Sequence, residues 1–330
     1  MVMKHLSRQL YDSPRDPKKL WLDCNECNCQ RTRNLIKKIF RQVDYNRCTE
    51  YPALYKLYGK LAEFVGTKSP HLLLTHGADH AIRIFFEHNR GHRALIMRPT
   101  FAMNEVYAHY YCNEVRYIDY DNVSRDADTL PKIIGALGQL KKDDIFVLAS
   151  PDSPIGVQYT KHELWNIADI CRIQGVKFLV DETYILFGNR EHTMIPWIDD
   201  TMSVCHSFSK SLGLAGTRLG YLVSKDQTVK DSKHMKDIGN VQAGIMEGAL
   251  DNIHKFLNLI DKQIELRDKI STYNGWSNTY GNYVHANKSI VDIDKLNQIA
   301  YTRQIAHPSM KDLVRVTLPN KLSCIQSILN

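Results

Sequence analysis

The chain has 330 residues, of which 43% are hydrophobic and 24% are charged, a composition typical of a soluble globular protein with a substantial core. It contains no apolar run near the roughly 20 residues that a membrane helix requires, and residues 1–6 lack the apolar stretch of a signal peptide. The net charge of +7 is spread along the chain, apart from the basic stretch 31–38, and favours anionic small substrates over nucleic acid. We therefore expect a cytoplasmic protein that binds neither nucleic acid nor membrane.

Alternating strands and helices are predicted from about residue 70 onward. Residues 1–30 are polar and irregular, and we expect them to form an N-terminal arm. Short, continuously apolar segments are typical of strands covered on both faces; here they are 71–75, 94–98, 115–120, 145–149, 177–181, 203–207 and 219–223. Helical patterns lie between them, at 78–87, after Phe101 and at 161–174. This alternation predicts an α/β fold with a mainly parallel sheet.

A second, smaller domain is predicted at the C-terminal end. The pattern over 240–271 is helical and contains no proline, so we expect one long helix that links two domains. The last part of the chain returns to mixed strand and helix, with strands expected at 289–291 and 313–318. The predicted division is an arm over 1–30, a large domain over 31–250 and a small domain over 251–330.

The eight cysteines are expected to be free thiols, because no secretory signal accompanies them. Cys24, Cys27 and Cys29 form a C-x-x-C-x-C cluster that could suggest a metal site. A tetrahedral site needs a fourth ligand, and the sequence has no second paired cluster. We therefore expect no metal.

Motifs with possible ligand chemistry follow several of the predicted strands, where ligands bind in open α/β sheets. Gly77-Ala78-Asp79-His80 opens a helix whose first amides could bind phosphate, although simple capping by Asp79 would also explain it. Phe101 could stack on a planar ring or pack in the core. The segment 150–156, with two prolines and a glycine, predicts a rigid turn. Asp181 ends a buried strand and needs a cation, either a ligand's ring nitrogen or a nearby Lys or Arg.

The segment 207–220, SFSKSLGLAGTRLG, carries the most specific pattern. Its hydroxyl residues and Arg218 can bind a phosphate, and Lys210 can form an imine with a carbonyl group. A serine- and glycine-rich loop with a surface lysine is the alternative. Pyridoxal phosphate carries both a phosphate and an aldehyde, and it would satisfy the whole segment.

In their shared order these motifs resemble the fold-type I pyridoxal-phosphate-dependent aminotransferases, and in particular the histidinol-phosphate aminotransferase branch. The segments that carry the resemblance are 22–26, Tyr51-Pro52, 77–79, 181–184, 207–221 and 313–317. The resemblance implies a mainly parallel central sheet with helices on both faces, a smaller α/β C-terminal domain and a homodimer. It also implies pyridoxal phosphate as the cofactor.

The resemblance further implies roles for single residues. Lys210 would form the Schiff base and move a proton between the substrate α-carbon and the cofactor. Asp181 would pair with the pyridinium nitrogen, and Tyr184 would bond the 3-oxygen of the ring. The other implied contacts are Phe101 on the ring face, Ser153 at the 3-oxygen, Ala78, Asp79, Ser207, Ser209 and Arg218 at the phosphate, Tyr51 from the partner subunit, and Arg315, Arg303 and Asn25 at the substrate.

Several positions depart from the pattern of the family. Asp152 and Ser153 stand where the turn normally has two asparagines, Ile155 stands for threonine, and His80 stands for glutamate. Ser153 is shorter than asparagine and would reach the ring oxygen poorly or through water. These changes affect the prediction of the substrate more than the prediction of the cofactor.

The leading hypothesis is an aminotransferase of amino-acid metabolism that acts on an amino acid or an amino-alcohol phosphate, with a keto acid as partner. A decarboxylase of an amino-acid phosphate, similar to threonine-phosphate decarboxylase, is the alternative, and a catalytically idle homologue is a third reading. A distal phosphate could be bound by Arg8, Tyr11 or Arg15 of the arm together with Arg303, although these could equally be ordinary surface residues.

Overall fold

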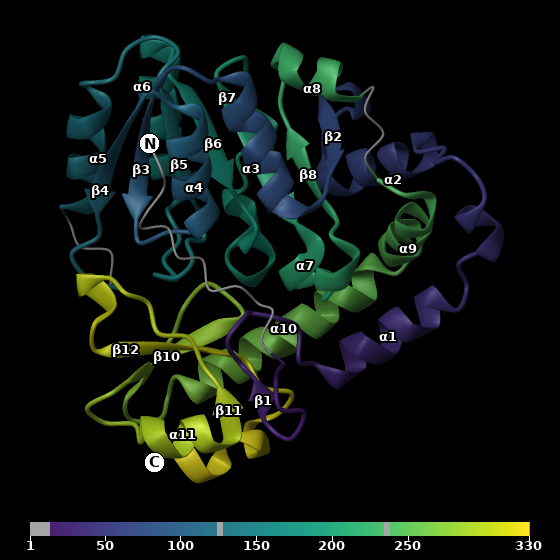
Figure 1. Ribbon diagram of the computed structural model, residues 1–330, viewed down its shortest axis with the longest axis vertical. Coiled ribbons are helices and arrows are strands. Elements are labelled where there is room, and N and C mark those ends of the chain that lie inside the picture. Colours follow the sequence, from purple (N-terminus) through teal and green to yellow (C-terminus); the bar gives the residue numbers. More distant parts are fainter. Residues whose placement is uncertain (1–13, 124–127, 234–237, 330) are drawn as a thin grey trace.

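The computed structural model describes residues 14–123, 128–233 and 238–329, and its main feature is a seven-stranded sheet of order β2-β8-β7-β6-β5-β3-β4 (Figure 1). Strand β8 runs antiparallel to both of its neighbours, and the remaining pairs are parallel. The mainly parallel sheet predicted from the sequence is therefore confirmed. The strands are β2 (Leu72–Thr75), β3 (Arg93–Arg98), β4 (Glu114–Asp119), β5 (Ile145–Ala149), β6 (Lys177–Asp181), β7 (Met202–Ser207) and β8 (Gly220–Val223).

Helices cover both faces of this sheet because alternate strand residues point to opposite sides. On one face Leu73 and Ile96 pack in a core with residues of α3 (Gly77–His88) and with Ala108 of α4 (Ala102–Tyr111). On the other face Leu72 and Leu74 join a larger core. Its helices are α2 (Tyr55–Val65), α5 (Thr129–Leu137), α6 (Lys161–Gln174) and α9 (Asn240–Asp251), while α1 (Gln30–Phe40) adds Ile39 and α8 (Gln227–Ser232) lies near β2.

The predicted elements of the large sheet agree closely with the observed ones. Strands 145–149 and 177–181 and helix 161–174 have the bounds of β5, β6 and α6, and the other strands differ only near their ends. Continuous apolar runs identify these strands because both faces of the sheet are buried.

The single long helix predicted over 240–271 is wrong, because the segment forms two helices. Helix α9 ends at Asp251 and α10 (Ile253–Ile270) begins two residues later. Asn252, between them, has φ −112° and ψ 18°, and its side-chain amide donates to the Gly248 carbonyl at 2.9 Å. An asparagine that bonds backbone in this way competes with the helix and interrupts it. Within the described residues, neither these helices nor any other is both long and apolar enough to cross a bilayer.

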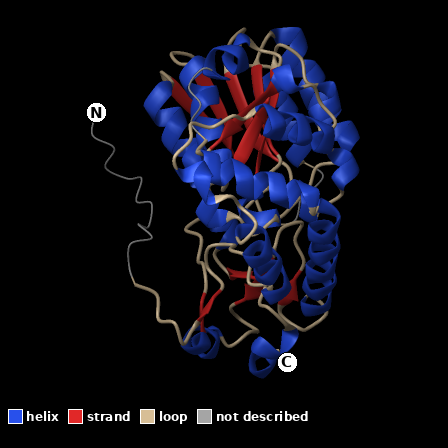
Figure 2. Cartoon of the chain, turned by 90° about the vertical axis from the view of Figure 1, so that its right-hand side faces the viewer, coloured by secondary structure: helices blue, strands red, loops and turns tan. Residues whose placement is uncertain are grey.

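A smaller sheet, of order β12-β10-β9, lies below the large one in both views (Figures 1 and 2). It consists of the antiparallel strands β9 (Trp276–Ser277), β10 (Tyr283–Asn287) and β12 (Leu313–Thr317). Helix α11 (Ile293–Ile299), between β10 and β12 in the chain, contributes Leu296 to the core of this sheet. The strand predicted at 313–318 is confirmed as β12. The strand predicted at 289–291 is wrong, since Ile290 and Val291 donate back to the Asn287 carbonyl and form a turn.

The start of the chain is less irregular than expected, because part of it joins the small sheet region. Strand β1 (Leu20–Trp21) pairs in parallel with β11 (Ala300–Tyr301). Leu22 is buried in the core of the small domain with Val314 and Val316. The segment after β1 is thereby held between the two sheets.

Candidate active site

The candidate site lies at the carboxyl ends of the central parallel strands, which meet at one edge of the sheet. Asp181 ends β6, and Ser207 ends β7. The turn over 150–156 follows β5, and Phe101 caps α4 shortly after β3. The order of strands in the sheet thus brings together motifs that are far apart in the sequence.

Asp181 is a buried carboxyl group, with only 5% of its surface exposed. Its Oδ1 accepts from the Thr183 N–H at 2.9 Å, and the Cys205 thiol lies beside it. Burial raises the pKa of Asp181, although the bonds from Thr183 and Cys205 oppose this. Within the described residues it has no ion-pair partner of the kind that the salt-bridge alternative required. A cationic ring nitrogen would supply the missing positive charge.

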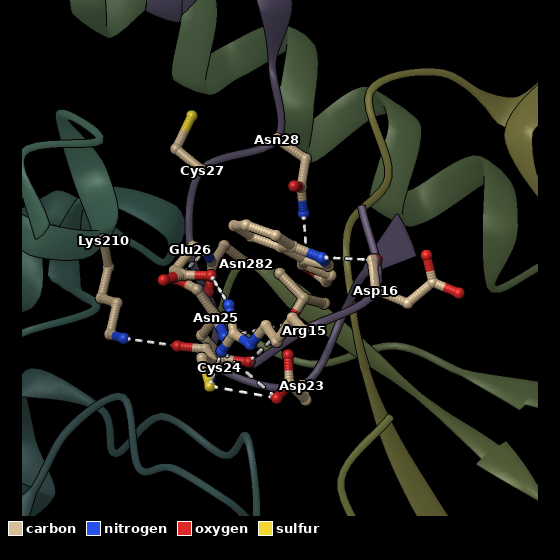
Figure 3. Close-up of polar contacts among 12 residues, drawn as sticks. Arg15, Asp16, Asp23, Cys24, Asn25, Glu26, Cys27, Asn28, Lys210 and Asn282 are labelled. Atoms are coloured by element: carbon tan, nitrogen blue, oxygen red, sulfur yellow. Dashed lines mark hydrogen bonds and ion pairs between the residues drawn. The ribbon is translucent and has the colours of Figure 1, made fainter. Parts of the chain in front are cut away.

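Lys210 lies in α7 (Phe208–Ser211), and its Nζ donates to the Cys24 carbonyl at 2.7 Å (Figure 3). It is therefore directed into the molecule and is not a surface lysine. Desolvation, aided by the positive charge of Arg315, lowers the pKa of Lys210 to about 8. A substantial fraction of the amine is neutral near physiological pH, as a nucleophile requires.

Around the start of α3 the structure forms a cradle for an anion. Gly77 has φ +74°, and a Cβ at this position would lie 3.2 Å from Arg218 Nη2 and 3.5 Å from Ser207 Oγ. The first N–H groups of a helix have no partners within the helix, so they can bind phosphate. The Ser209 hydroxyl is buried and has no partner among the described residues. Arg218, Ser207, Ser209 and the amides of Ala78 and Asp79 suit a phosphate group.

The alternative interpretation of the Gly77–His80 motif was helix capping by Asp79, but the Asp79 side chain does not cap the helix. Its Oδ1 accepts from the Tyr107 hydroxyl at 3.1 Å, and the residue before the helix makes no side-chain cap. Asp79 can therefore serve a phosphate through its backbone N–H, while its carboxylate is held by Tyr107.

Tyr184 is buried between the two sheets, and its hydroxyl oxygen accepts from Asn25 Nδ2 at 2.8 Å. Burial raises the pKa of Tyr184, while Arg315, Asn25 and Ser153 lower it. Ser153 Oγ also accepts from Arg315 Nη1 at 3.4 Å. Ser153 therefore lies within the site although it is shorter than the asparagine of related turns.

Arg315, in β12, extends from the small domain toward these groups. Its Nη2 donates to the Asp23 carbonyl at 2.7 Å, and its guanidinium lies 5.5 Å from the centre of the Tyr283 ring. The backbone of Arg303 pairs with that of Arg315, with N–O distances of 3.0 and 2.9 Å. Residues paired in this way project side chains from the same face, which places the two arginines together.

The arm contributes differently from the sequence-based expectation. Arg15 forms ion pairs with Glu26 at 2.6 Å and Asp23 at 3.3 Å, and it lies over the Trp21 ring (Figure 3). Its charge is therefore already matched by two carboxylates. Arg8 and Tyr11 lie outside the described residues.

Two further predicted contacts lie at the surface. Phe101 is 37% exposed, and Tyr51 is 96% exposed in the single chain. Phe101 is at the strand edge where a ring could cover it. Tyr51 projects outward, so a role for it depends on a partner subunit.

Sequence reasoning missed several groups at the site. The Tyr283 hydroxyl donates to the Asp152 carbonyl at 2.9 Å, and the carbonyl of Cys24 holds Lys210. Thr317, at the end of the segment 313–317, accepts from the Asn25 backbone N–H at 2.9 Å. Asp152 stands where the turn of the family normally has an asparagine. Its side chain is buried, and desolvation raises its pKa to about 8. The cysteine cluster forms no group of three or more potential metal ligands among the described residues.

The sequence that forms this site matches a known protein family. The model of aminotransferase class I and II matches residues 17–272. The chain belongs to this family. It is an aminotransferase of fold type I, and its cofactor is pyridoxal phosphate, as the resemblance implied. Within the described residues, Asp181 is buried without an ion-pair partner and the Ser209 hydroxyl at the cradle has no hydrogen-bond partner, which fits the ring nitrogen and the phosphate of that cofactor.

Similar proteins include enzymes of the branch that the sequence resembles. Histidinol-phosphate aminotransferase from Clostridium novyi is 24% identical over 96% of this chain and 92% of its own length. The enzyme of the same name from Hydrogenobaculum sp. is 26% identical over 87% and 83%. The solved histidinol-phosphate aminotransferase from Sinorhizobium meliloti, in complex with pyridoxal-5'-phosphate, has a TM-score of 0.76 and 18% identity, covering 96% of this chain and 95% of that one.

A solved structure of another activity has a similar fold. L-threonine-O-3-phosphate decarboxylase from Porphyromonas gingivalis has a TM-score of 0.73 and 17% identity, covering 94% of this chain and 97% of that one. The fold alone therefore does not separate transamination from decarboxylation.

The lowered pKa of Lys210 predicts its reactivity. In cofactor-free protein, the rate at which Lys210 attaches pyridoxal should be half-maximal near pH 8, because the neutral amine dominates only above its pKa of about 8. Replacing Arg315 by leucine should move the midpoint upward, since a nearby positive charge is removed. Absorbance rates across a pH series measure this, with Lys210→Ala as the blank. An unmoved midpoint in Arg315→Leu would contradict the electrostatic account.

The position of Arg218 in the anion cradle predicts that its guanidinium group binds the cofactor phosphate. Arg218→Ala should weaken pyridoxal phosphate binding about 10- to 100-fold, because a charge-assisted hydrogen bond is lost. Fluorescence titration of cofactor-free protein gives the Kd. Arg116→Ala, which removes an arginine from a surface ion pair with Glu114, is the matched control and should bind normally. Equal affinity in both variants would rule out the assigned phosphate site.

Proposed function

We propose that this enzyme transfers an amino group between an amino-alcohol phosphate or amino acid, with histidinol phosphate as the model substrate, and a keto acid. The observation that carries the proposal is the desolvated amine of Lys210, with its pKa lowered to about 8, in a site that also contains Asp181 and Arg315. The named activity of the relatives supports the choice of substrate.

The bound cofactor supplies an electron sink that stabilises negative charge on the substrate carbon attached to nitrogen. Asp181 holds the protonated ring nitrogen and keeps it charged. Tyr184 would bond the 3-oxygen, Ser153 would reach that oxygen poorly or through water, and Phe101 would cover the ring. Lys210 would hold the cofactor through its aldehyde group. Its desolvated amine, with a pKa of about 8, is suited to take a proton from the substrate α-carbon and to give it back.

The paired arginines support a substrate with an anionic end. Arg315 can hold a carboxylate in bidentate fashion, and Arg303 beside it supplies a second guanidinium for a distal phosphate. Arg15 is matched by Asp23 and Glu26, so we do not assign the phosphate to it. The carboxylate of the keto acid and the phosphate of the amino-alcohol phosphate can therefore bind the same cationic region, each in its own half of the reaction.

Decarboxylation of an amino-acid phosphate is the second candidate, favoured by the threonine phosphate decarboxylase of similar fold. The same side chains would serve both reactions, because each reaction needs the electron sink that the cofactor would supply. A catalytically idle homologue is disfavoured, since Lys210 is present and desolvated and such a protein would have no need of it.

The proposed reaction is tested by single-turnover spectroscopy. Histidinol phosphate should bleach the visible band of the Lys210-bound cofactor, and a keto acid should restore it, because the amino group is stored on the cofactor between half-reactions. A panel of amino acids and amino-acid phosphates tests the alternatives. Release of carbon dioxide without bleaching would replace transamination by decarboxylation.

Borohydride provides the control for covalent attachment. Reduction should label Lys210 in wild-type protein and label nothing in Lys210→Ala, as read by peptide mass spectrometry. An unlabelled Lys210 in cofactor-saturated protein would instead support the idle homologue.

We also propose that the enzyme is a cytoplasmic homodimer. Large aromatic side chains gather near the first helices with high exposed fractions: Phe40 59%, Tyr45 81%, Tyr51 96% and Tyr55 82%. Clustered exposed aromatics of this kind are typical of interfaces between subunits. In the dimer, Tyr51 would reach the cofactor phosphate of the partner.

Hybrid dimers test the contribution of Tyr51. Lys210→Ala and Tyr51→Ala should each be nearly inactive, and a re-equilibrated equal mixture should recover about one quarter of wild-type activity, because half of the dimers regain one intact site. Sedimentation velocity checks the dimer in each sample. A mixture no more active than its parents would show that each site is built from one chain.

A further inference from the structure

Asn25, which the resemblance places at the substrate, lies beside Tyr184 in the structure. Only 1% of its surface is exposed, and its side chain lies between the two sheets. Its backbone has φ 54°, in the left-handed region that asparagine tolerates better than most residues. Asn282 Nδ2 donates to the Asn25 carbonyl at 2.9 Å, and Asn25 directly follows Cys24, whose carbonyl accepts from Lys210 (Figure 3).

The orientation of the Asn25 amide follows from its bonds to Thr317. The Asn25 backbone N–H donates to Thr317 Oγ1 at 2.9 Å, a direction that cannot be reversed. The single hydroxyl hydrogen of Thr317 donates to Asn25 Oδ1 at 3.0 Å, and with the amide reversed this hydrogen would have no acceptor among the described residues. Since Oδ1 faces Thr317, Nδ2 must face Tyr184, where the separation is 2.8 Å.

This orientation determines how Tyr184 uses its hydroxyl group. Because Nδ2 can only donate, the Tyr184 oxygen is the acceptor, and the phenol hydrogen must point elsewhere. The Tyr283 ring stands edge-on to that of Tyr184, with centroids 5.8 Å apart and planes at 83°, which restricts movement of the phenol. Ser153, in the turn that follows β5, also hydrogen-bonds the Tyr184 hydroxyl group, and this bond lowers the pKa of Tyr184.

We propose that Asn25 is a positioning residue for Tyr184, directing the phenol hydrogen toward the 3-oxygen of the cofactor and linking that bond to the seating of the small domain. The link runs from Thr317 in β12 through the Asn25 amide to Tyr184, which belongs to the large domain. This role gains weight because Ser153 stands where related turns have a longer asparagine. The inference rests on the proposed role of Tyr184.

The test is a pH titration of the absorbance of the cofactor-loaded enzyme, without substrate. A donor to the 3-oxygen stabilises its negative charge, so the conjugated nitrogen loses its proton at lower pH. Asn25→Ala should raise the midpoint by about 0.5 to 1 pH unit, the size of one lost hydrogen bond. The isosteric Asn25→Asp should raise it at least as much, because its carboxylate would accept the phenol hydrogen.

A double-mutant cycle shows whether Asn25 acts through the phenol. In the Tyr184→Phe background, Asn25→Ala should leave the midpoint in place, because the group that it directs is gone. A further shift in that background would overturn the proposal.

Asn282→Ala is the matched structural control, since it removes a buried amide bond to the same segment but spares the Asn25–Tyr184 contact. It should lower the thermal unfolding temperature and leave the midpoint unmoved. An equal shift in Asn282→Ala would assign the effect to general loosening and overturn the proposal. An unchanged midpoint in Asn25→Ala that still carries a Lys210-dependent band would refute this inference alone. Loss of that band from wild-type protein would instead refute the proposed function.

Discussion

The burial of Asp181 without a cation from the described part of the chain is the constraint around which the site is organised. A buried carboxylate is costly, and the raised pKa of Asp181 shows that the group favours its protonated form until a positive group arrives from outside. The parallel strands on both sides of β6 fix that carboxylate at the sheet edge. Lys210 and the anion cradle lie along the same edge, so one molecule with a basic ring, an aldehyde and a phosphate can satisfy them together.

The small domain contributes to the site by holding the turn that borders it. The Tyr283 hydroxyl donates to the Asp152 carbonyl, and His285 Nε2 lies 2.9 Å from the Pro154 carbonyl. Arg315 adds its bond to Ser153. A segment of the large domain that follows β5 is thereby shaped by side chains of β10 and β12. Tyr283 and His285 contact main-chain carbonyls of the turn. These contacts therefore do not depend on which side chains stand at Asp152 and Ser153.

The large sheet and the groups on its edge could be predicted from the sequence because their information is local. Apolar runs identify strands buried on both faces, and the polar residue that follows each run marks the sheet edge, as with Asp181 and Ser207. Asn25 could not be interpreted in this way. Its partner Tyr184 lies 159 residues away, and only the packing of β12 against the large domain brings them together. The pairing of β1 with β11 likewise depends on contacts that no local pattern contains, whereas the helix break at Asn252 rests on a local bond to the Gly248 carbonyl.

The bond between Lys210 and the Cys24 carbonyl has an evolutionary consequence. A side-chain partner can be lost by one substitution, whereas a main-chain carbonyl is present whatever residue occupies position 24. The resting place of the lysine is therefore encoded in the path of the backbone, and that path turns at the left-handed Asn25. Residue 24 can vary to suit different substrates while the amine stays where it is, so specificity and the lysine's position can evolve separately.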